Sequence, residues 1–506
     1  MIKPYLILLH KLQDHFKNPT MTKLPIMAKS LIVLVLIPAV LSLPAPQIGD
    51  FGENTGPVGG VDPPTPTVTV ESGSLYGPSS LLGELASPSQ VSGGDSAIVQ
   101  DFQLVNGQEA DADLGLYLDF DSIEKPQPIR GTFGQTDPGP RTFNYDRLNP
   151  DSFAPPGTDS GDVPQAKWPL GLSSNRLGTG KLSGWARQQN VDQLPAAKEM
   201  AGVDMRLAPH AYRELHWHTA NEWALMLKGS VRLSAVNEDG ETFNDGISAG
   251  DVWFFPAGIP HSIQALDEGC EFLIVFDDGS FTEDGTFLVS EMFLRNPKEV
   301  LSKNLQTPVS AFDNLPKDQR YIFPGTPAPA NFSEQNVTSP YGELPVNESY
   351  TYHWSQQAPL TVPGGSVKIL DTTTFPIATD LAAALVVVQP GAMRELHWHL
   401  TSDEWNYFLQ GSARITVYDA PQSSRTFDFT AGDVGYIPAS NSHYIENTGD
   451  TDVIFLEVLK QGKFTDISVS QWLALTPKQV VQDTLFKLGL PDETLDNLPK
   501  KKTFIK

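Results

Sequence analysis

A long internal repeat is the feature that most constrains how this chain can fold. The hexapeptide Arg-Glu-Leu-His-Trp-His at 213–218 recurs at 394–399. Ala-Gly-Asp-Val at 249–252 recurs at 431–434, and Asp-Asn-Leu-Pro-Lys at 313–317 recurs at 496–500. Because the spacing between the copies is nearly constant over the three blocks, one whole domain is duplicated. The length of 506 residues leaves room for two such domains.

Each copy has the residue pattern of β-strands. Apolar and polar residues alternate over 230–236 in the first copy and over 412–417 in the second. Lys228-Gly229 and Gln410-Gly411 mark turn points between strands, and the 41 glycines and 42 prolines favour a turn-rich chain. Short strands separated by such signals predict an all-β fold built from closed barrels or sandwiches.

A few helices are expected to flank the strands. Asn296-Pro297 and Thr476-Pro477 each combine a residue that favours the N-cap position with a proline suited to the first helical position. The sequence therefore predicts that a helix starts at each of these pairs, after the strands of each copy.

The strongest candidate site is a set of three histidines and one glutamate that occurs in each copy. On a strand, His216 and His218 would place both imidazoles on one face, because successive side chains alternate. Glu222 follows where the next strand begins, and His261 comes from a separate strand far downstream. The second copy repeats the set as His397, His399, Glu404 and His443.

Ordinary core or surface histidines are the alternative interpretation of these sets. Six of the ten histidines, however, fall at equivalent places in the two copies. Three neutral nitrogens and one carboxylate form a mostly hard ligand set, which suits Mn(II) or Fe(II) better than a closed structural zinc site. The sequence therefore predicts one divalent metal ion in each domain.

The same residues resemble the signatures of the cupin superfamily. The second copy matches the two cupin motifs at Gly391, His397, His399, Glu404, Gly411, Gly432, Pro438, His443 and Asn447, with Ser440 where glycine is usual. The first copy departs from them at His210 and Ala265, and neither position is a metal ligand. The resemblance implies two cupin barrels of the double-stranded β-helix, or jelly-roll, type.

More narrowly, the chain resembles the bicupin oxalate decarboxylases from Lys125 to about Leu490. The blocks that carry this resemblance are 155–159 (Pro-Pro-Gly-Thr-Asp), both Arg-Glu-Leu-His-Trp-His blocks, 276–281 (Phe-Asp-Asp-Gly-Ser-Phe), 432–436 (Gly-Asp-Val-Gly-Tyr) and 455–457 (Phe-Leu-Glu). The resemblance implies an enzyme that converts oxalate to formate and CO2, with two Mn(II) ions per chain and dioxygen as a co-catalyst.

The resemblance also implies how oxalate is bound. Arg213 and Arg394 stand three residues before the first metal histidine of each set, where the family binds its substrate. A guanidinium group can hold a carboxylate through two hydrogen bonds, which fits this role. A structural salt bridge is the alternative for each arginine.

Two glutamates are the candidate catalytic acids. The family uses a glutamate on a mobile lid over the N-terminal site as proton donor, and this position corresponds to Glu283. The lid carries Thr-Glu-Asp-Gly where family members often carry Ser-Glu-Asn-Ser; an ordinary acidic surface loop is the alternative. At the spacing of the two Ala-Gly-Asp-Val blocks, Glu457 pairs with Val275 and Glu283 pairs with Thr465. The second site is therefore expected to have an acid on a strand and none at the lid position.

Two other functions stay open on the sequence. Without protonation at the right moment, oxalate would be oxidised to two CO2 with hydrogen peroxide, which is the oxalate oxidase reaction. A non-catalytic storage or binding bicupin is the second alternative, although both ligand sets are complete. The formal net charge of −25 argues against nucleic acid and anionic membrane as partners and leaves homo-oligomers open.

The N-terminus predicts export, because Lys29 precedes a short apolar run at 31–43 that resembles a secretory signal. Three N-x-S/T sequons, at Asn331, Asn336 and Asn347, fit a glycosylated loop of a secreted protein. The expected organisation is a signal region at 1–43 (with Met27 as an alternative start), a low-complexity extension at 44–124, a first cupin domain at 125–325, a linker at 326–350 and a second cupin domain with a helical tail at 351–506.

Overall fold

The structure is a computed structural model that describes residues 155–180, 183–485 and 492–506. The predicted signal region, the extension at 44–124 and residues 125–154 lie outside the described residues. Within the described ranges, no helix is both long and apolar enough to cross a membrane.

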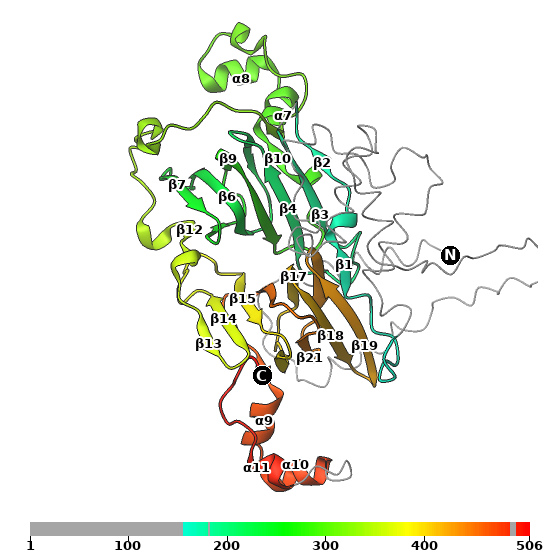
Figure 1. The fold of residues 1–506 in the computed structure, drawn as a ribbon. Coiled ribbons are helices and arrows are strands. Elements are labelled where there is room, and N and C mark those ends of the chain that lie inside the picture. Colours follow the sequence, from blue (N-terminus) through cyan, green and yellow to red (C-terminus); the bar gives the residue numbers. More distant parts are fainter. Residues whose placement is uncertain (1–154, 181–182, 486–491) are drawn as a thin grey trace, which may run out of the picture. The chain divides into compact units, whose positions relative to one another are not determined.

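The first copy forms one antiparallel sheet of 11 strands around two long strands, β6 (Glu222–Val236) and β9 (His261–Phe276) (Figure 1). These two strands pair with each other along most of their length. The other nine strands are β2 (Arg176–Leu177), β3 (Gly184–Gln189), β4 (Ala201–Leu207), β5 (Tyr212–Trp217), β7 (Thr242–Ser248), β8 (Val252–Phe255), β10 (Phe287–Leu288), β11 (Ile322–Phe323) and β12 (Thr351–Tyr352).

The second copy forms a seven-stranded and a five-stranded sheet. The first contains β1 (Lys167–Pro169), β13 (Leu360–Val362), β14 (Gly365–Leu370), β15 (Ala382–Val388), β17 (Glu404–Gln410), β20 (Asp433–Ile437) and β22 (Val453–Leu459). The second contains β16 (Met393–Trp398), β18 (Ser412–Asp419), β19 (Ser423–Thr430), β21 (His443–Asn447) and β23 (Ile467–Ser468). Strand β1 lies within the predicted first domain (125–325) but pairs with β20 of the second copy. The predicted all-β class is confirmed.

The two predicted glycine turns differ between the copies. At Gly411 the chain leaves β17 and enters β18, as expected. At Gly229 the chain instead stays within the single strand β6, where the pairing register with β9 shifts on both sides. Gly229 has a φ of 69°, and an added Cβ would lie 2.0 Å from the carbonyl oxygen of Gly269. The Lys228-Gly229 turn is therefore a bulge, which only glycine accommodates without strain.

Short helices follow each set of strands, and their starts correct the predicted caps. They are α7 (Val289–Arg295) and α8 (Lys298–Leu305) in the first copy, and α9 (Val469–Leu475), α10 (Lys478–Leu485) and α11 (Asp492–Asp496) in the second. Asn296 and Thr476 close the C-termini of α7 and α9, where their side chains donate hydrogen bonds to the carbonyls of Met292 and Trp472. They do not cap the following helices, because the proline intervenes.

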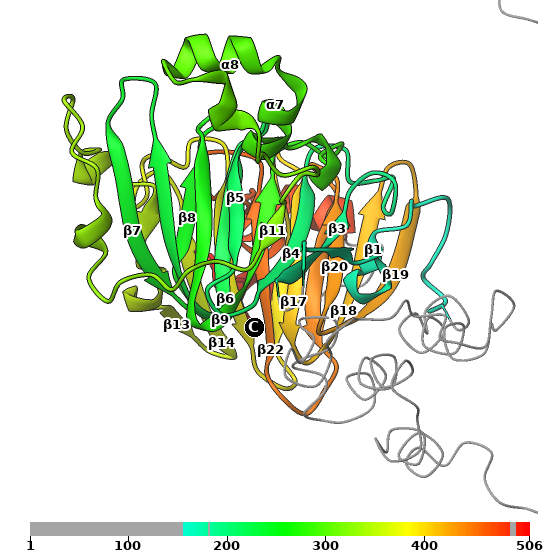
Figure 2. The same ribbon diagram turned by 90° about the horizontal axis from the view of Figure 1, so that it is seen from above.

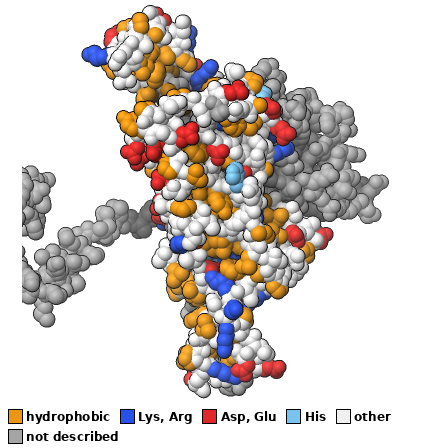
Figure 3. Space-filling view, turned by 90° about the vertical axis from the view of Figure 1, so that its left-hand side faces the viewer, with side chains coloured by type: hydrophobic (Ala, Val, Ile, Leu, Met, Phe, Trp, Pro, Cys, Tyr) orange, Lys and Arg blue, Asp and Glu red, His pale blue; other side chains and the backbone are white. Residues whose placement is uncertain are grey.

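The helical segments expose apolar side chains. In Figure 3 hydrophobic atoms gather on the lobe at the top, which contains α7 and α8. Met292, Val300 and Leu305 are exposed there, and Trp472, Leu475 and Val480 are exposed on α9 and α10. Exposed apolar patches often mark protein–protein contacts. Homo-oligomer formation stays a prediction.

The two copies share a buried core, and Figure 2 shows their strands side by side. Trp223 and Leu273 of the first copy pack in one cluster with Trp405 and Tyr407 of the second. The indole Nε1 of Trp405 donates a hydrogen bond of 2.7 Å to Gln189, and an added Cβ at Gly202 would lie 2.2 Å from the Trp405 ring. These contacts fix the position of one barrel on the other, and a side chain at Gly202 would disrupt them.

Two carboxyl groups are buried near this shared core. Asp204 on β4 and Glu271 on β9 are almost inaccessible to solvent. Burial raises the pKa of both groups, and the arginines Arg187 and Arg206 offset this only in part. Because the charge of Asp204 raises the pKa of Glu271 further, the pair keeps a proton at a pH where exposed carboxyls are ionised.

We expect the Glu271→Gln variant to be more stable than the unchanged chain at neutral pH. A folded-state pKa above the unfolded value of about 4 gives stability that is complete at low pH and is lost as pH rises. The amide mimics the protonated acid and removes this loss. Urea unfolding between pH 4 and 8 should show a gain that grows by up to about 1.4 kcal/mol per pH unit. A stability difference that does not change with pH would contradict the assignment.

Candidate metal and substrate sites

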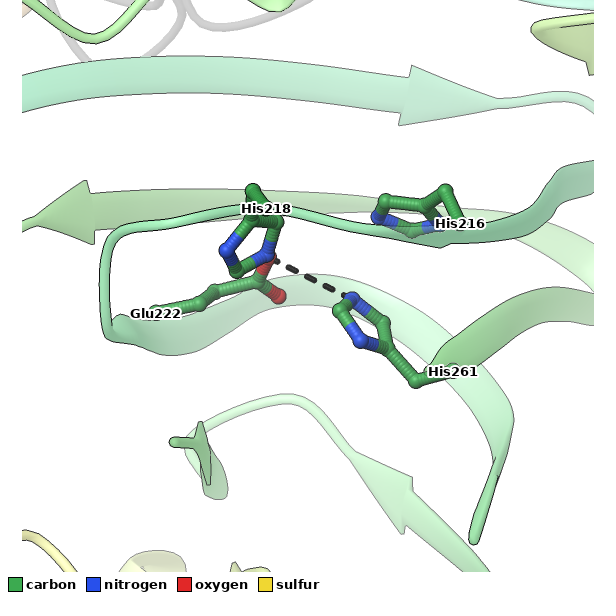
Figure 4. Close-up of side chains that lie close together, drawn as sticks. All are labelled: His216, His218, Glu222 and His261. Carbon is green, nitrogen blue, oxygen red and sulfur yellow. Dashed lines mark hydrogen bonds and ion pairs between the residues drawn. The ribbon is translucent and has the colours of Figure 1, made fainter. Parts of the chain in front are cut away.

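The four predicted ligands of the first copy meet inside the barrel. His216 lies on β5, His218 directly follows β5, and Glu222 and His261 are the first residues of β6 and β9. Their ligand atoms all lie within 4.8 Å of one another, and all four side chains are buried. Figure 4 shows the three imidazoles and the carboxylate facing a common centre. His218 and His261 lie 2.9 Å and 3.5 Å from Oε2 of Glu222.

The second copy brings its four predicted ligands together in the same way. His397 lies on β16, His399 directly follows it, and Glu404 and His443 begin β17 and β21. All ligand atoms again lie within 4.8 Å of one another. His399 and His443 each lie 2.7 Å from Oε2 of Glu404. In both copies the first and last histidines are opposite each other on neighbouring strands.

The hydrogen bonds around the histidines select which ring nitrogen faces the centre. All six Nδ1 atoms lie 2.7–3.0 Å from a backbone carbonyl oxygen: those of Glu214, Ala220, Ile259, Glu395, Thr465 and Asn441. A carbonyl only accepts, so each Nδ1 carries hydrogen and Nε2 is the nitrogen available to an ion. Nε2 of His261, His397, His399 and His443 is buried and makes no well-oriented hydrogen bond. This donor set fits a divalent metal ion.

The second oxygen of each glutamate is also held in place. Nε1 of Trp253 donates a hydrogen bond of 2.6 Å to Oε1 of Glu222, and Nδ2 of Asn406 donates one of 2.7 Å to Oε1 of Glu404. These partners leave Oε2 directed at the histidines. Burial alone would raise the pKa of Glu222, but His261 and His218 outweigh it and hold the pKa well below its usual range. The sequence analysis missed both partners: Trp253 reaches Glu222 from the neighbouring strand β8, and Asn406 lies two residues after Glu404 on β17.

A β-bulge places the substrate arginines beside the ligands. On a regular strand, side chains three residues apart point to opposite faces. Between Arg213 and His216 the pairing of β5 with β9 shifts by one residue, and the same shift occurs between Arg394 and His397. Both arginines are consequently buried inside the barrels with the histidines.

Arg213 faces the predicted lid acid. Its Nη2 lies 3.1 Å from Oε2 of Glu283, whose residue is only 4% exposed. Nη1 of Arg213 is buried without a hydrogen-bond partner. A small cavity, too narrow for a water molecule while the lid is closed, is lined by Arg213, Glu283, His216, His218 and Glu222, together with apolar side chains such as Ile274, Phe276 and Phe281. The structure thus brings the lid acid, the arginine and the metal-binding residues of the first copy to one space.

The second copy differs from the first, and the expectation that it has no acid at the lid position is wrong. Nη2 of Arg394 lies 2.7 Å from Oδ2 of Asp466, so an acid does occupy the lid position. Phe281 and Phe464 make equivalent contacts with His218 and His399, and β10 and β23 pair with equivalent residues. Five residues (282–286) separate Phe281 from β10 in the first copy, but only Thr465 and Asp466 separate Phe464 from β23 in the second. A fixed offset across this deletion therefore paired the wrong residues.

Glu457 also has a different counterpart from the predicted one. Glu457 is opposite Asn406 in the pairing of β17 with β22, and the equivalent position in β9 is Ile274, not Val275. Its Oε1 lies 3.2 Å from Nε2 of His399 and 3.5 Å from Nη2 of Arg394. The second centre thus has a carboxylate where the first has an apolar side chain.

The glutamate of the repeated hexapeptide binds the backbone of a later segment of the chain in each copy. Glu214 accepts hydrogen bonds from the backbone amides of Ser290, Arg320 and Tyr321. Glu395 accepts equivalent bonds from Thr503 and Phe504. The sequence analysis assigned these glutamates no role, although their presence in both copies was a usable signal.

Metal loading of the second centre should release a proton from His399. Burial would lower the pKa of this imidazole, but its contacts with Glu404 and Glu457 raise the pKa to about 10. At pH 7 the ring is then protonated in metal-free protein, and it must lose that proton before Nε2 can bind an ion. Calorimetric titration with Mn(II) in buffers of different ionisation enthalpy measures the release. Glu457→Gln should reduce it; an unchanged release would contradict the role of Glu457.

Comparison with known proteins agrees with this geometry. The Cupin family profile matches residues 173–310 and again 354–489. The chain is 45% identical over 377 residues to "Oxalate decarboxylase OxdC" of Bacillus subtilis (strain 168), covering 74% of this chain and 96% of that protein. It is 40% identical over 385 residues to a "Probable oxalate decarboxylase" of Arthroderma benhamiae, covering 75% and 93%.

Solved structures give the same result. The structure of oxalate decarboxylase from Bacillus subtilis at pH 4.6 has a TM-score of 0.69 and 45% identity, covering 75% of this chain and 97% of that one. Another structure of the Bacillus enzyme, at 44% identity and the same TM-score, comes from a study of its Mn(II) centres and covers 75% and 99%. With two cupin profiles, two complete ligand sets and this degree of identity, the chain belongs to the bicupin oxalate decarboxylase family.

Proposed function

We propose that this chain is a manganese-dependent oxalate decarboxylase whose turnover site is the centre in the first copy. The reaction converts hydrogen oxalate into formate and CO2, so one C–C bond breaks and one C–H bond forms. The observation that carries the proposal is the buried Glu283 carboxyl, which faces Arg213 in the cavity lined by the metal-binding residues. A buried acid beside the substrate position is what proton delivery to carbon requires.

Each group in this cavity has a separate task. His216, His218, Glu222 and His261 would hold the ion, and Mn(II) suits three imidazoles and one carboxylate with open positions. Bound manganese supplies a Lewis acid and a redox partner for oxalate. The free Nη1 of Arg213 can bind a substrate carboxylate. Its positive charge attracts the anion locally, although the chain as a whole is negatively charged. The apolar wall of Phe276 and Phe281 limits the access of water.

The position of Glu283 favours the decarboxylase over the oxidase reaction. After CO2 leaves, the remaining carbon needs one proton to become formate. The oxidase reaction instead consumes dioxygen and two protons per oxalate dianion and gives two CO2 and hydrogen peroxide. Because Glu283 is buried on the cavity side of the lid, its proton can reach the carbon without exchange with bulk water. The changed lid sequence is the feature that keeps the oxidase reaction as the alternative.

We infer that the second centre holds the same metal but binds oxalate less well. Glu457 lies beside His399 and Arg394, where the first centre has Ile274. A buried carboxylate at this position repels a dianion and competes for the arginine. Asp466 adds a second acid to the same guanidinium group, and Lys502 is paired with Asp466 in turn. Complete ligand sets in both centres argue against a mere storage protein.

Glu283→Gln should separate oxalate consumption from formate production. The amide keeps the size of the side chain but cannot donate a carboxylic proton, so the rate of formate production should fall by about 10²–10⁴-fold. Manganese content should not change, and the share of peroxide among the products should rise. Product analysis by NMR and a coupled peroxide assay measures both.

Two further variants control this experiment. Glu457→Gln should have a smaller effect on formate, because it lies in the second centre. Arg213→Lys keeps the charge but loses the planar fork, so it should damage substrate binding and turnover together. Near-normal formate in Glu283→Gln with complete loss in Glu457→Gln would assign turnover to the second centre and overturn the proposal.

We also propose that the protein is exported and glycosylated. Asn331, Asn336 and Asn347 are exposed between the two copies, where a glycan can be attached without unfolding. Protein from a eukaryotic secretory host should lose its N-terminal apolar run and lose mass on treatment with an N-glycosidase. Intact Met1 or Met27 with no change of mass would contradict this proposal.

A further inference from the structure

The lid over the first centre is held by a second arginine, on the outside of the cavity. The lid comprises residues 282–286, and Glu283 and Asp284 are adjacent in it. Glu283 points inward to Arg213, whereas the Asp284 side chain is 83% exposed. Oδ1 of Asp284 lies 3.1 Å from Nη1 of Arg176 on β2, and the Arg176 side chain is 22% exposed. Two neighbouring acids of the lid are thus paired with two arginines on opposite sides.

The two arginines are connected through one aromatic ring. The guanidinium carbon of Arg176 lies 3.9 Å from the ring centroid of Tyr321, and that of Arg213 lies 4.5 Å from the same centroid. Tyr321 is buried, and its backbone amide is bound by Glu214. Nη2 of Arg176 also donates a hydrogen bond of 3.4 Å to Gln319. Stacking and these bonds hold Arg176 in place before the lid closes, which lowers the entropy cost of pairing with Asp284.

A third contact orients the same part of the lid. The side-chain oxygen of Gln188 on β3 accepts a hydrogen bond of 3.0 Å from the backbone amide of Glu283. Its amide nitrogen donates one of 3.4 Å to the hydroxyl of Thr282. These neutral contacts set the position of the lid backbone. The Arg176–Asp284 pair is the charged contact that does not use a cavity residue.

Substrate binding makes this outer contact necessary. Oxalate and Glu283 compete for Arg213, because both present carboxylates to the same guanidinium group. When Arg213 binds oxalate, its tie to the lid weakens at the stage when the lid must exclude water and keep Glu283 near the carbon. A contact from Asp284 to an arginine outside the cavity is not subject to that competition.

We propose that Arg176 is a positioning residue, which keeps the lid closed through Asp284 while Arg213 binds substrate. This inference rests on the proposed decarboxylase function of the first centre. It also explains why the acid next to Glu283 is exposed, since its partner lies outside the cavity. The second centre differs in using one acid for both contacts: Asp466 pairs with Arg394 and with Lys502, and both cations lie over the ring of Phe504.

The test uses the full, manganese-loaded chain with Asp284→Asn, Arg176→Gln and the double variant. An exposed ion pair shifts an opening equilibrium by about two- to fivefold. Each single variant should therefore lower the formate-to-peroxide ratio by about two- to fivefold at unchanged manganese content. The double variant should be no worse than either single variant. Added salt should lower the ratio of the unchanged chain but not that of Asp284→Asn, because salt screens exposed charges.

A second readout does not depend on activity. A glutamate-specific protease can cut after Glu283 only when the lid is open, since that residue is buried in the closed lid. The rate of this cut, followed by mass spectrometry, should rise by about two- to fivefold in Asp284→Asn. Glu291→Gln is the matched control: it removes an exposed carboxylate paired with Arg295 on α7, away from the lid, and should change neither readout.

The outcomes distinguish the positioning role of Arg176 from the proposed function. If the protease cuts after Glu283 at the same rate in Asp284→Asn and in the unchanged chain, the positioning role of Arg176 is overturned. Strictly additive effects in the double variant would also overturn it. If the unchanged chain makes no formate, the decarboxylase proposal fails, while the protease readout still decides whether Arg176 holds the lid. Arg176→Lys, which keeps the charge but loses the planar group, should fall between the unchanged chain and Arg176→Gln.

Discussion

The pairing of β5 with β9, and of β16 with β21, is the constraint on which both centres depend. It sets the first and last histidines opposite each other, and one extra residue in the first strand of each pair turns the arginine toward the same interior. Without that bulge, a residue three positions before the histidine would face the other side of the strand. Backbone carbonyls then bind every Nδ1, so the main chain itself selects the nitrogen that faces the ion.

Duplication gave two similar metal centres with different surroundings. In the first, one arginine faces one lid acid, and an apolar residue completes the wall. In the second, the lid is three residues shorter, and two carboxylates share the arginine. The difference is electrostatic: one carboxylate contacts the arginine in the first copy, whereas two carboxylates contact it in the second. The shared core between the copies holds the two centres in one frame.

Much of this arrangement follows from the sequence. The paired His-x-His blocks, the downstream histidines and the alternating strands were enough to predict a duplicated all-β fold and to name eight ligands that the structure brings together. Arg213 and Glu283 came from the family resemblance, and they meet as expected.

Other features depend on contacts that the sequence does not encode locally. Asp466 was missed because a constant offset cannot reveal a three-residue deletion in the lid. The counterpart of Glu457 was misplaced because the second copy has one extra residue between His443 and Glu457. Trp253 reaches the metal-binding Glu222 from the neighbouring strand β8. Asn296 and Thr476 are residue types that favour N-cap positions, but each directly precedes a proline. Their side chains instead donate hydrogen bonds to backbone carbonyls of the preceding helix. Tertiary context decided each of these cases.

The central claim is that oxalate binds beside the first metal ion in preference to the second. It can be tested by electron–nuclear double resonance of Mn(II) with ¹³C-labelled oxalate, in chains that keep only one centre. Emptying the first centre by His216→Ala with His218→Ala should abolish the ¹³C coupling. Emptying the second by His397→Ala with His399→Ala should leave the coupling in place. Coupling that survives the first change and disappears with the second would contradict the account.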